Sequence, residues 1–201
     1  EILNLSNEFV VAALSKEKFL ILDNSKDQEG WTIKFREDPI FLDPRSKNLG
    51  ARLIINLEKL YLSLKKLELK TANVEDYYRH SHELGISQID NQNLQNKIFG
   101  IECNFEELNG IDFKKGCYVG QENTTRIKLK EKLNNRLFAI KVLEGKINSE
   151  EIILEDKEIG KLLINNQNPF ALIKFQNNKF NFDDIYKCGN AIIKVQKPEW
   201  L

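Results

Sequence analysis

K-G-C-Y-V-G-Q-E, residues 115–122, is the stretch from which the fold of this chain is most readily inferred. Its two glycines permit backbone angles that a side chain forbids, so we expect a tight turn that holds Cys117 in place. The polar run 121–130 then predicts a helix. A thiol beside lysines and a helix N-terminus has its thiolate favoured by charge and dipole. The pattern is typical of a reactive cysteine, and a buried, inert cysteine is the alternative.

After this stretch the chain changes character. Glycines and asparagine pairs separate short β-type runs at regular spacing, which is typical of a small barrel or sandwich. We place a domain boundary between residues 130 and 131, so that residues 131–201 form a C-terminal β-barrel domain. The expected strands cover residues 137–142, 151–154, 159–164, 170–175 and 191–195.

Residues 1–130 mix strand-like and helix-like patterns. The predicted fold class is therefore α+β, an antiparallel sheet with helices followed by the small barrel. Asp43-Pro44-Arg45 predicts a rigid turn whose arginine is a candidate to pair with a carboxylate or bind an anion. The expected strands cover residues 8–14, 18–22, 31–35 and 49–55, and the expected helices residues 57–69, 74–84 (with Asn73 as cap and Gly85 as stop), 91–99 and 104–108.

Composition limits the classes of function. The chain has 201 residues and a formal net charge of zero, which argues against a general nucleic-acid or membrane-surface role. Three cysteines without a C-x-x-C pair, no secretory signal and no apolar run of spanning length favour a soluble protein of a reducing compartment. Because the chain lacks methionine and opens in a strand-like run, we expect it to be the later part of a longer protein.

Common catalytic motifs are absent from the sequence. It contains no G-x-x-x-x-G-K-[ST], G-x-G-x-x-G or G-x-S-x-G, so nucleotide-loop and serine-hydrolase functions lose their usual support. His80 and His82 lie two residues apart and point to different sides of a helix, so they cannot share a metal. We expect one to face the interior and the other water, and we predict no metal site.

Residues 115–122, which we call the glycine stretch, together with Arg126 resemble the K-G-C-Y-x-G-Q-E-x-x-x-R signature of YgfZ-type folate-binding proteins. That family includes a mitochondrial iron–sulfur cluster assembly factor and is related to the T-protein (aminomethyltransferase) of the glycine cleavage system. The resemblance runs from about residue 40 to the end, with Ser81 where the family usually has arginine. The segments that agree in order are Asp43-Pro44-Arg45 and Leu49-Gly50-Ala51-Arg52 (D-P-R, then L-G-x-R), Tyr77 with His80 and Glu83-Leu84-Gly85-Ile86, Glu102, Asn135-Arg136-Leu137 and Gly160.

This resemblance implies three subdomains in a ring around a channel that binds tetrahydrofolate. Residues 1–130 then form a folate-binding-like α+β region without the N-terminal part of the family domain. Glu83 matches the glutamate with which T-proteins hold the pterin, and Cys117 faces the channel as the functional thiol. The other candidates for folate binding are Tyr118, Gln121 and Arg126, and the signature itself comprises Lys115, Gly116, Cys117, Tyr118, Gly120, Gln121, Glu122 and Arg126.

Three functions follow from the resemblance. The leading one is a tetrahydrofolate-binding protein that supports iron–sulfur cluster assembly or repair, including for enzymes that modify tRNA. The alternatives are an aminomethyltransferase-like, folate-dependent one-carbon transferase, and an interaction scaffold with a degenerate folate cavity, so whether the protein is an enzyme stays open. The implied partners are folate and iron–sulfur assembly proteins or cluster enzymes, with no direct nucleic-acid or membrane partner. A bacterial cytoplasm is the expected location and the mitochondrial matrix the alternative.

Overall fold

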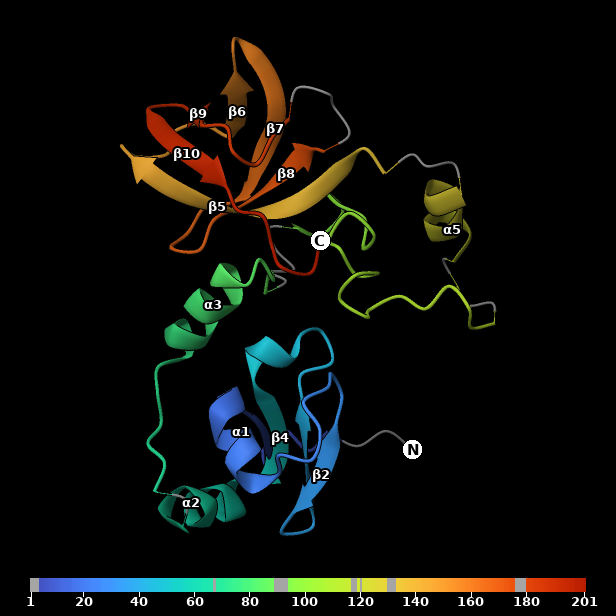
Figure 1. The fold of residues 1–201 in the computed structure, drawn as a ribbon, viewed down its shortest axis with the longest axis vertical. Coiled ribbons are helices and arrows are strands. Elements are labelled where there is room, and N and C mark those ends of the chain that lie inside the picture. Colours follow the sequence, from blue (N-terminus) through green and yellow to red (C-terminus); the bar gives the residue numbers. More distant parts are fainter. Residues whose placement is uncertain are drawn as a thin grey trace. The chain divides into compact units, whose positions relative to one another are not determined.

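The computed structural model describes residues 4–66, 68–88, 94–116, 119, 121–129, 133–175 and 180–201. The chain is α+β, as the sequence predicts, and divides into two compact units, residues 1–77 and 78–201 (Figure 1). No helix within these described ranges combines the length and the apolar character needed to cross a membrane. The domain boundary placed between residues 130 and 131 stays a prediction.

The first unit is an antiparallel sheet with strand order β1-β4-β3-β2. These strands are β1 (Phe9–Leu14), β2 (Thr32–Phe35), β3 (Asp38–Leu42) and β4 (Ala51–Asn56). Helix α1 (Lys16–Leu22) and helix α2 (Leu57–Lys66) also belong to this unit, with the short 3-10 helix η1 (Lys47–Leu49) before β4. Its core is made of Phe19, Ile40, Leu42, Ala51, Leu53 and Ile55.

Three of the strands predicted in this unit are confirmed, as β1, β2 and β4, and the fourth is wrong. Residues 18–22 belong to helix α1, because the Ser15 side chain caps the helix by accepting from the amide of Lys18 at 3.4 Å. The helix then places Phe19 in the core with no exposed surface. Strand β3 was not predicted, since Pro39 interrupts its pattern.

Gly50 allows the backbone to pass closely between the end of β1 and the start of β4. It has φ = 86°, and a β-carbon at this position would lie 2.2 Å from the carbonyl oxygen of Leu14. Its own carbonyl accepts from the amide of Asp43 at 2.9 Å. Only glycine fits both the positive φ and the contact, so Gly50 fixes where β4 begins.

Helix α3 (Val74–Glu83) is confirmed with its predicted cap and stop. The side chain of Asn73 accepts from the amide of Glu75 at 3.2 Å. Gly85 has φ = 71° and ends the helix in the left-handed conformation, and the amide of Ile86 then donates to the carbonyl of Ser81 at 2.9 Å.

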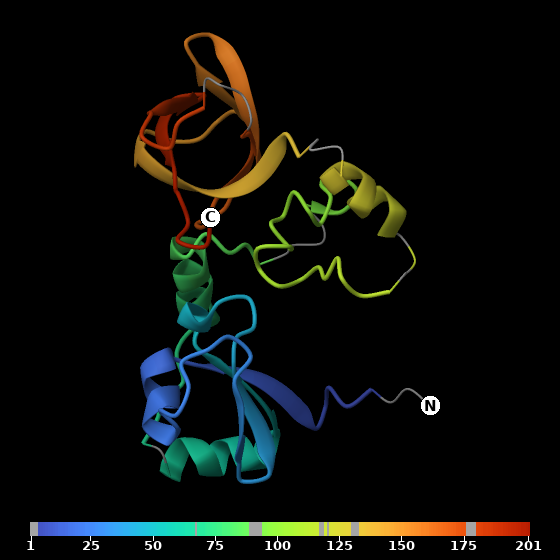
Figure 2. The same ribbon diagram turned by 45° about the vertical axis from the view of Figure 1, so that its right-hand side comes forward.

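The second unit is built on a closed antiparallel barrel in the order β10-β5-β8-β7-β6-β9, visible as a ring of strands in Figure 2. The predicted barrel is thus confirmed, and only the three-residue strand β9 lacked a signal long enough to be predicted. Its interior holds Phe138, Ile152, Ile173, Tyr186 and Ile193, all at most 1% exposed. The strands are β5 (Asn135–Glu144), β6 (Glu151–Leu154), β7 (Lys157–Ile164), β8 (Phe170–Lys174), β9 (Tyr186–Cys188) and β10 (Ala191–Val195).

Between α3 and the barrel, the described residues form mainly turns and helix α5 (Gln121–Leu129). Helix α5 confirms the helix predicted to follow the glycine stretch. The helix predicted at 104–108 is wrong: Asn104 and Asn109 have φ values of 62° and 57°, a left-handed conformation that interrupts a helix. The helix predicted at 91–99 falls partly outside the described residues.

We predict that Gly50→Ala destabilises the protein far more than Gly30→Ala. Both glycines have positive φ, which costs an alanine about 1–2 kcal/mol. A β-carbon at Gly30 would have no atom within 4 Å, whereas at Gly50 it meets backbone. Urea unfolding of the two variants measures the difference, and equal losses would show that the close approach at Gly50 is unimportant.

Candidate functional site

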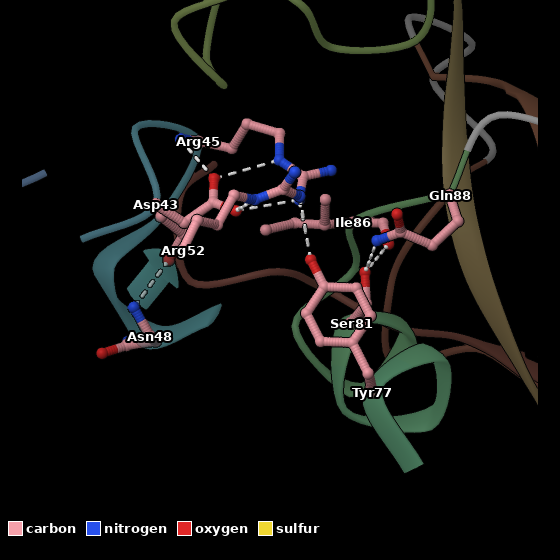
Figure 3. A network of polar contacts seen from close by, with 9 residues as sticks. Asp43, Arg45, Asn48, Arg52, Tyr77, Ser81, Ile86 and Gln88 are labelled. Atoms are coloured by element: carbon pink, nitrogen blue, oxygen red, sulfur yellow. Dashed lines mark hydrogen bonds and ion pairs between the residues drawn. The ribbon is translucent and has the colours of Figure 1, made fainter. Parts of the chain in front are cut away.

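The first candidate site surrounds Asp43, which directly follows strand β3. Its side chain is 2% exposed and accepts two hydrogen bonds from Arg45, from Nε to Oδ1 and from Nη2 to Oδ2, each 3.0 Å long. Arg52, on β4, donates from Nε to the same Oδ2 at 2.6 Å. One buried carboxylate is therefore shared by two guanidinium groups (Figure 3).

Tyr77 completes this cluster from the first turns of helix α3. Its hydroxyl accepts from Nη2 of Arg45 at 2.9 Å and from Nη2 of Arg52 at 3.1 Å. Each guanidinium group thus donates both to the carboxylate of Asp43 and to the phenol oxygen of Tyr77. The expectation that Arg45 pairs with a carboxylate in a turn is confirmed; we call Asp43, Arg45, Arg52 and Tyr77 the arginine cluster.

The pKa of the Asp43 carboxyl depends on its arginine partners. Burial pushes the pKa of Asp43 upward, but the hydrogen bonds and charge of Arg45, with a hydrogen bond from Arg52, outweigh burial and hold it below its usual value. Burial also opposes the ionisation of Arg45, because it lowers the pKa of that group, but Asp43 and then Tyr77 raise the pKa above its usual value. Both residues therefore remain ionised at neutral pH.

Glu83, the predicted pterin ligand, is exposed on the last turn of helix α3. The chain that follows it is fixed within the second unit. The buried hydroxyl of Ser81 donates to the carbonyl of Ile86 and accepts from Nε2 of Gln88 at 2.7 Å (Figure 3). Nε1 of Trp200 donates to the carbonyl of Leu84 at 3.0 Å. Ser81 thus orders the turn next to Glu83.

The two histidines of α3 lie in different environments, as predicted. His80 is exposed, whereas His82 is half-buried with Nε2 3.0 Å from the carbonyl oxygen of Pro169 and its ring edge-on to Phe170. Burial lowers the pKa of His82 below its ordinary value, despite hydrogen bonds to backbone that raise it. His82 is accordingly a packing residue of the second unit.

The glycine stretch is described only in part. Cys117, Tyr118 and Gly120 lie outside the described residues. The described members of the signature are exposed Lys115 and Gly116 before the turn, half-buried Gln121 as the first residue of α5, and exposed Glu122 and Arg126 on that helix. Their roles in folate binding stay predictions.

The other two cysteines are buried and poorly reactive. Cys103 is 6% exposed, and burial with the charge of Glu102 raises the pKa of its thiol to about 11. Cys188 is fully buried, donates its thiol hydrogen to the carbonyl of Ser149 at 3.2 Å, and has its pKa raised by burial. Since the thiolate is the reactive form, neither cysteine is a good nucleophile at neutral pH.

Asn104 is a buried polar residue whose role the sequence does not predict. Its Nδ2 donates to the carbonyl of Leu137 at 2.8 Å, and its Oδ1 accepts from Nη1 of Arg136 at 3.2 Å. Arg136 also forms an ion pair with Glu107. These contacts attach the turns around residue 104 to the start of β5. Asn104 has a positive φ of 62°, which only the structure shows, so no local sequence signal predicts its role.

Comparison with known proteins identifies relatives of this chain. No family model matches it. It is 33% identical over 119 residues to "Iron-sulfur cluster assembly factor IBA57 homolog, mitochondrial" of Dictyostelium discoideum, covering 58% of this chain and 29% of that protein. It is 31% identical over 117 residues to the mitochondrial IBA57 of Mus musculus (58% and 30%), and 38% identical over 88 residues to "tRNA-modifying protein YgfZ" of Buchnera aphidicola (41% and 26%).

IBA57 and YgfZ proteins are homologues of this chain. The resemblance to YgfZ-type proteins seen in the sequence is thereby confirmed. The matched region spans less than a third of each of these relatives, so their names describe longer proteins.

We predict that Asp43→Asn costs about 2–4 kcal/mol at neutral pH. Breaking a buried pair costs about 3–5 kcal/mol, and the arginines here are 26% and 32% exposed, which reduces the loss. Asp27→Asn is the matched control, because Asp27 also pairs with two cations, Lys16 and Lys47, at the surface. Chemical denaturation measures both variants, and an equal loss would contradict a special role for Asp43.

The pH dependence follows from the lowered pKa of Asp43. A carboxyl whose pKa is lower in the folded state adds stability above its unfolded value, about 3.9, and loses it as the pH falls through the folded value. The gap in stability between the native protein and Asp43→Asn should therefore be full at pH 6 and narrow below about pH 4. A gap that stays constant down to pH 2 would exclude this linkage.

Proposed function

We propose that this protein binds tetrahydrofolate and supports the assembly or repair of iron–sulfur clusters, with Cys117 as its functional thiol. The observation that carries the proposal is homology to proteins named as iron–sulfur cluster assembly factors, together with the K-G-C-Y-V-G-Q-E stretch. The YgfZ relative is named as tRNA-modifying, which fits a role in supplying cluster enzymes that modify tRNA. Partners are then cluster assembly proteins or cluster enzymes.

The contrast among the three cysteines supports Cys117 as the functional thiol. Cys103 and Cys188 are buried with raised pKa values, so neither offers a thiolate. Cys117 follows two lysines and precedes helix α5, which begins at Gln121. Positive charge and a helix N-terminus both favour a thiolate. Of the three, Cys117 has the sequence environment that suits chemistry.

Glu83 is the proposed pterin ligand. Its carboxylate is exposed at the end of α3, so it is available to a ligand, and the ordered turn after it limits its mobility. A carboxylate accepts paired N–H donors of a pterin ring through two charge-assisted hydrogen bonds. This assignment rests on the match between Glu83 and the glutamate with which T-proteins hold the pterin.

Relatives occur in two compartments, so the proposal covers two locations. IBA57 relatives are named as mitochondrial, and the YgfZ relative is bacterial. We propose a bacterial cytoplasm first and a mitochondrial matrix second.

The folate proposal is tested by titrating the full-length protein with tetrahydrofolate and measuring Kd by calorimetry. Glu83→Ala should raise Kd about tenfold or more, because charge-assisted hydrogen bonds contribute about 1.5–3 kcal/mol. Glu75→Ala, an exposed glutamate in the first turn of the same helix, should leave Kd unchanged. Equal affinities for both variants would remove Glu83 from the site. One-carbon transfer from an aminomethyl donor would favour the aminomethyltransferase alternative instead.

The thiol proposal is tested by alkylation and by complementation. Iodoacetamide should modify Cys117 at least tenfold faster than Cys103 and Cys188 in the folded protein at pH 7, as mass spectrometry of peptides reports, because buried thiols with raised pKa react slowly. In cells that lack the endogenous protein, Cys117→Ser should then fail to restore the activity of iron–sulfur enzymes. If Cys117→Ser at equal protein level fully restored the activity of iron–sulfur enzymes, the thiol of Cys117 would not be the functional group.

A further inference from the structure

The arginine cluster carries more positive charge than its own acid balances. Among the residues that the structure describes, Asp43 is its one carboxylate partner, and it serves both Arg45 and Arg52. Neither arginine pairs with a second acid among the residues that the structure describes. With both guanidinium groups and the carboxylate ionised, the cluster has an excess of one positive charge.

The two guanidinium groups are held close together in spite of their like charge. Their Nη2 atoms bond to the same hydroxyl oxygen of Tyr77, at 2.9 Å and 3.1 Å, so the two nitrogens lie within about 6 Å of each other. Figure 3 shows the two side chains converging between Asp43 and Tyr77. Like charges at this separation repel, and an anion between them relieves the repulsion.

Each guanidinium group also keeps hydrogen-bond donors for a further acceptor. Arg45 and Arg52 use Nε and Nη2 for Asp43 and Tyr77, and in the described part of the chain Nη1 of each has no hydrogen-bond acceptor. The side chains are 26% and 32% exposed, so solvent reaches them. Asp43 and Tyr77 thus fix the orientation of two partly exposed guanidinium groups.

We propose that Arg45 and Arg52 together bind an oxyanion group of a small ligand, a carboxylate or a phosphate, through the guanidinium nitrogens that Asp43 and Tyr77 leave available. Both groups offer several acceptor oxygens in the geometry that a guanidinium fork recognises. Asp43 and Tyr77 act as positioning residues, because they fix the guanidinium groups and leave the ligand to the Nη1 side. This site is independent of the folate proposal and of Cys117.

A structural role alone is the competing explanation. In that case the arginines only bury Asp43 and hold the start of α3, and added anions do no more than any salt. The two explanations differ in whether a specific anion saturates the site at constant ionic strength, since general screening does not saturate.

The test is titration of the full-length protein with inorganic phosphate and, separately, with glutarate, at ionic strength held constant with sodium chloride. The proposal expects saturable binding of at least one of them, with the affinity lowered about tenfold in Arg52→Lys and in Arg45→Lys, because lysine keeps the charge and loses the fork. Arg36→Lys, an exposed arginine of the same unit, is the control and should bind as the native protein does. Phosphate binding alone identifies a phosphate ligand, and glutarate binding alone a carboxylate ligand.

A second measurement keeps the proposal testable if the variants fold poorly. In isotope-labelled native protein, the anion that binds should shift the Nε–H signals of Arg45 and Arg52 along one saturation curve, while the Arg36 signal stays in place. No saturable binding of either anion, or equal binding by Arg36→Lys and Arg52→Lys, would overturn the proposal. Saturable binding that leaves the Arg45 and Arg52 signals unmoved would overturn it as well.

Discussion

A single buried carboxylate, Asp43, organises the end of the first unit. Burying it without partners would be prohibitive, since an unpaired charge in a protein interior costs several kcal/mol. The two arginines make the burial tolerable, and they come from either side of the turn at Gly50. Because Leu42 pairs with Ala51 and Phe41 with Arg52, the register of β3 and β4 brings Asp43 and Arg52 together. The D-P-R and L-G-x-R segments are therefore two halves of one network.

A buried amide has a comparable part in the second unit. Around residue 104 the chain has no regular secondary structure, and it contacts the barrel through side chains and through the amide of Leu137, which donates to the carbonyl of Glu102 at 2.8 Å. Asn104 satisfies the carbonyl of Leu137 and a donor of Arg136 at once. Each unit thus uses a buried polar side chain, Asp43 or Asn104, to fasten irregular backbone to a strand. Loss of either partner would leave a buried polar group unsatisfied, which is the costly case.

Local patterns predicted most of the regular structure but, of these networks, only the pairing of Arg45 with a carboxylate. Strands with alternating burial, such as β1 and β4, and the helices α2, α3 and α5 have periodicity or caps that can be read from neighbouring residues. Residues 18–22 were misassigned because a short apolar run suits a strand or a buried helix equally, and the cap at Ser15 decided it. Tyr77 reaches Arg45 across 32 positions, a separation that no local pattern encodes. The sequence suggested a turn with a paired arginine, and the structure supplied its partners.

Net charge is a poor guide to what this protein binds. The chain has equal numbers of acidic and basic residues, which argues against a broad polyanion surface. Yet charge is unevenly distributed at the scale of a ligand, since two arginines share Asp43 while Asp27 is shared by two lysines at the surface. A lysine ammonium is a point charge without a planar fork, so the excess charge of Lys16 and Lys47 selects no particular anion. Arg45 and Arg52 have planar groups fixed by Asp43 and Tyr77, and a fixed donor geometry is what turns excess charge into recognition of one oxyanion.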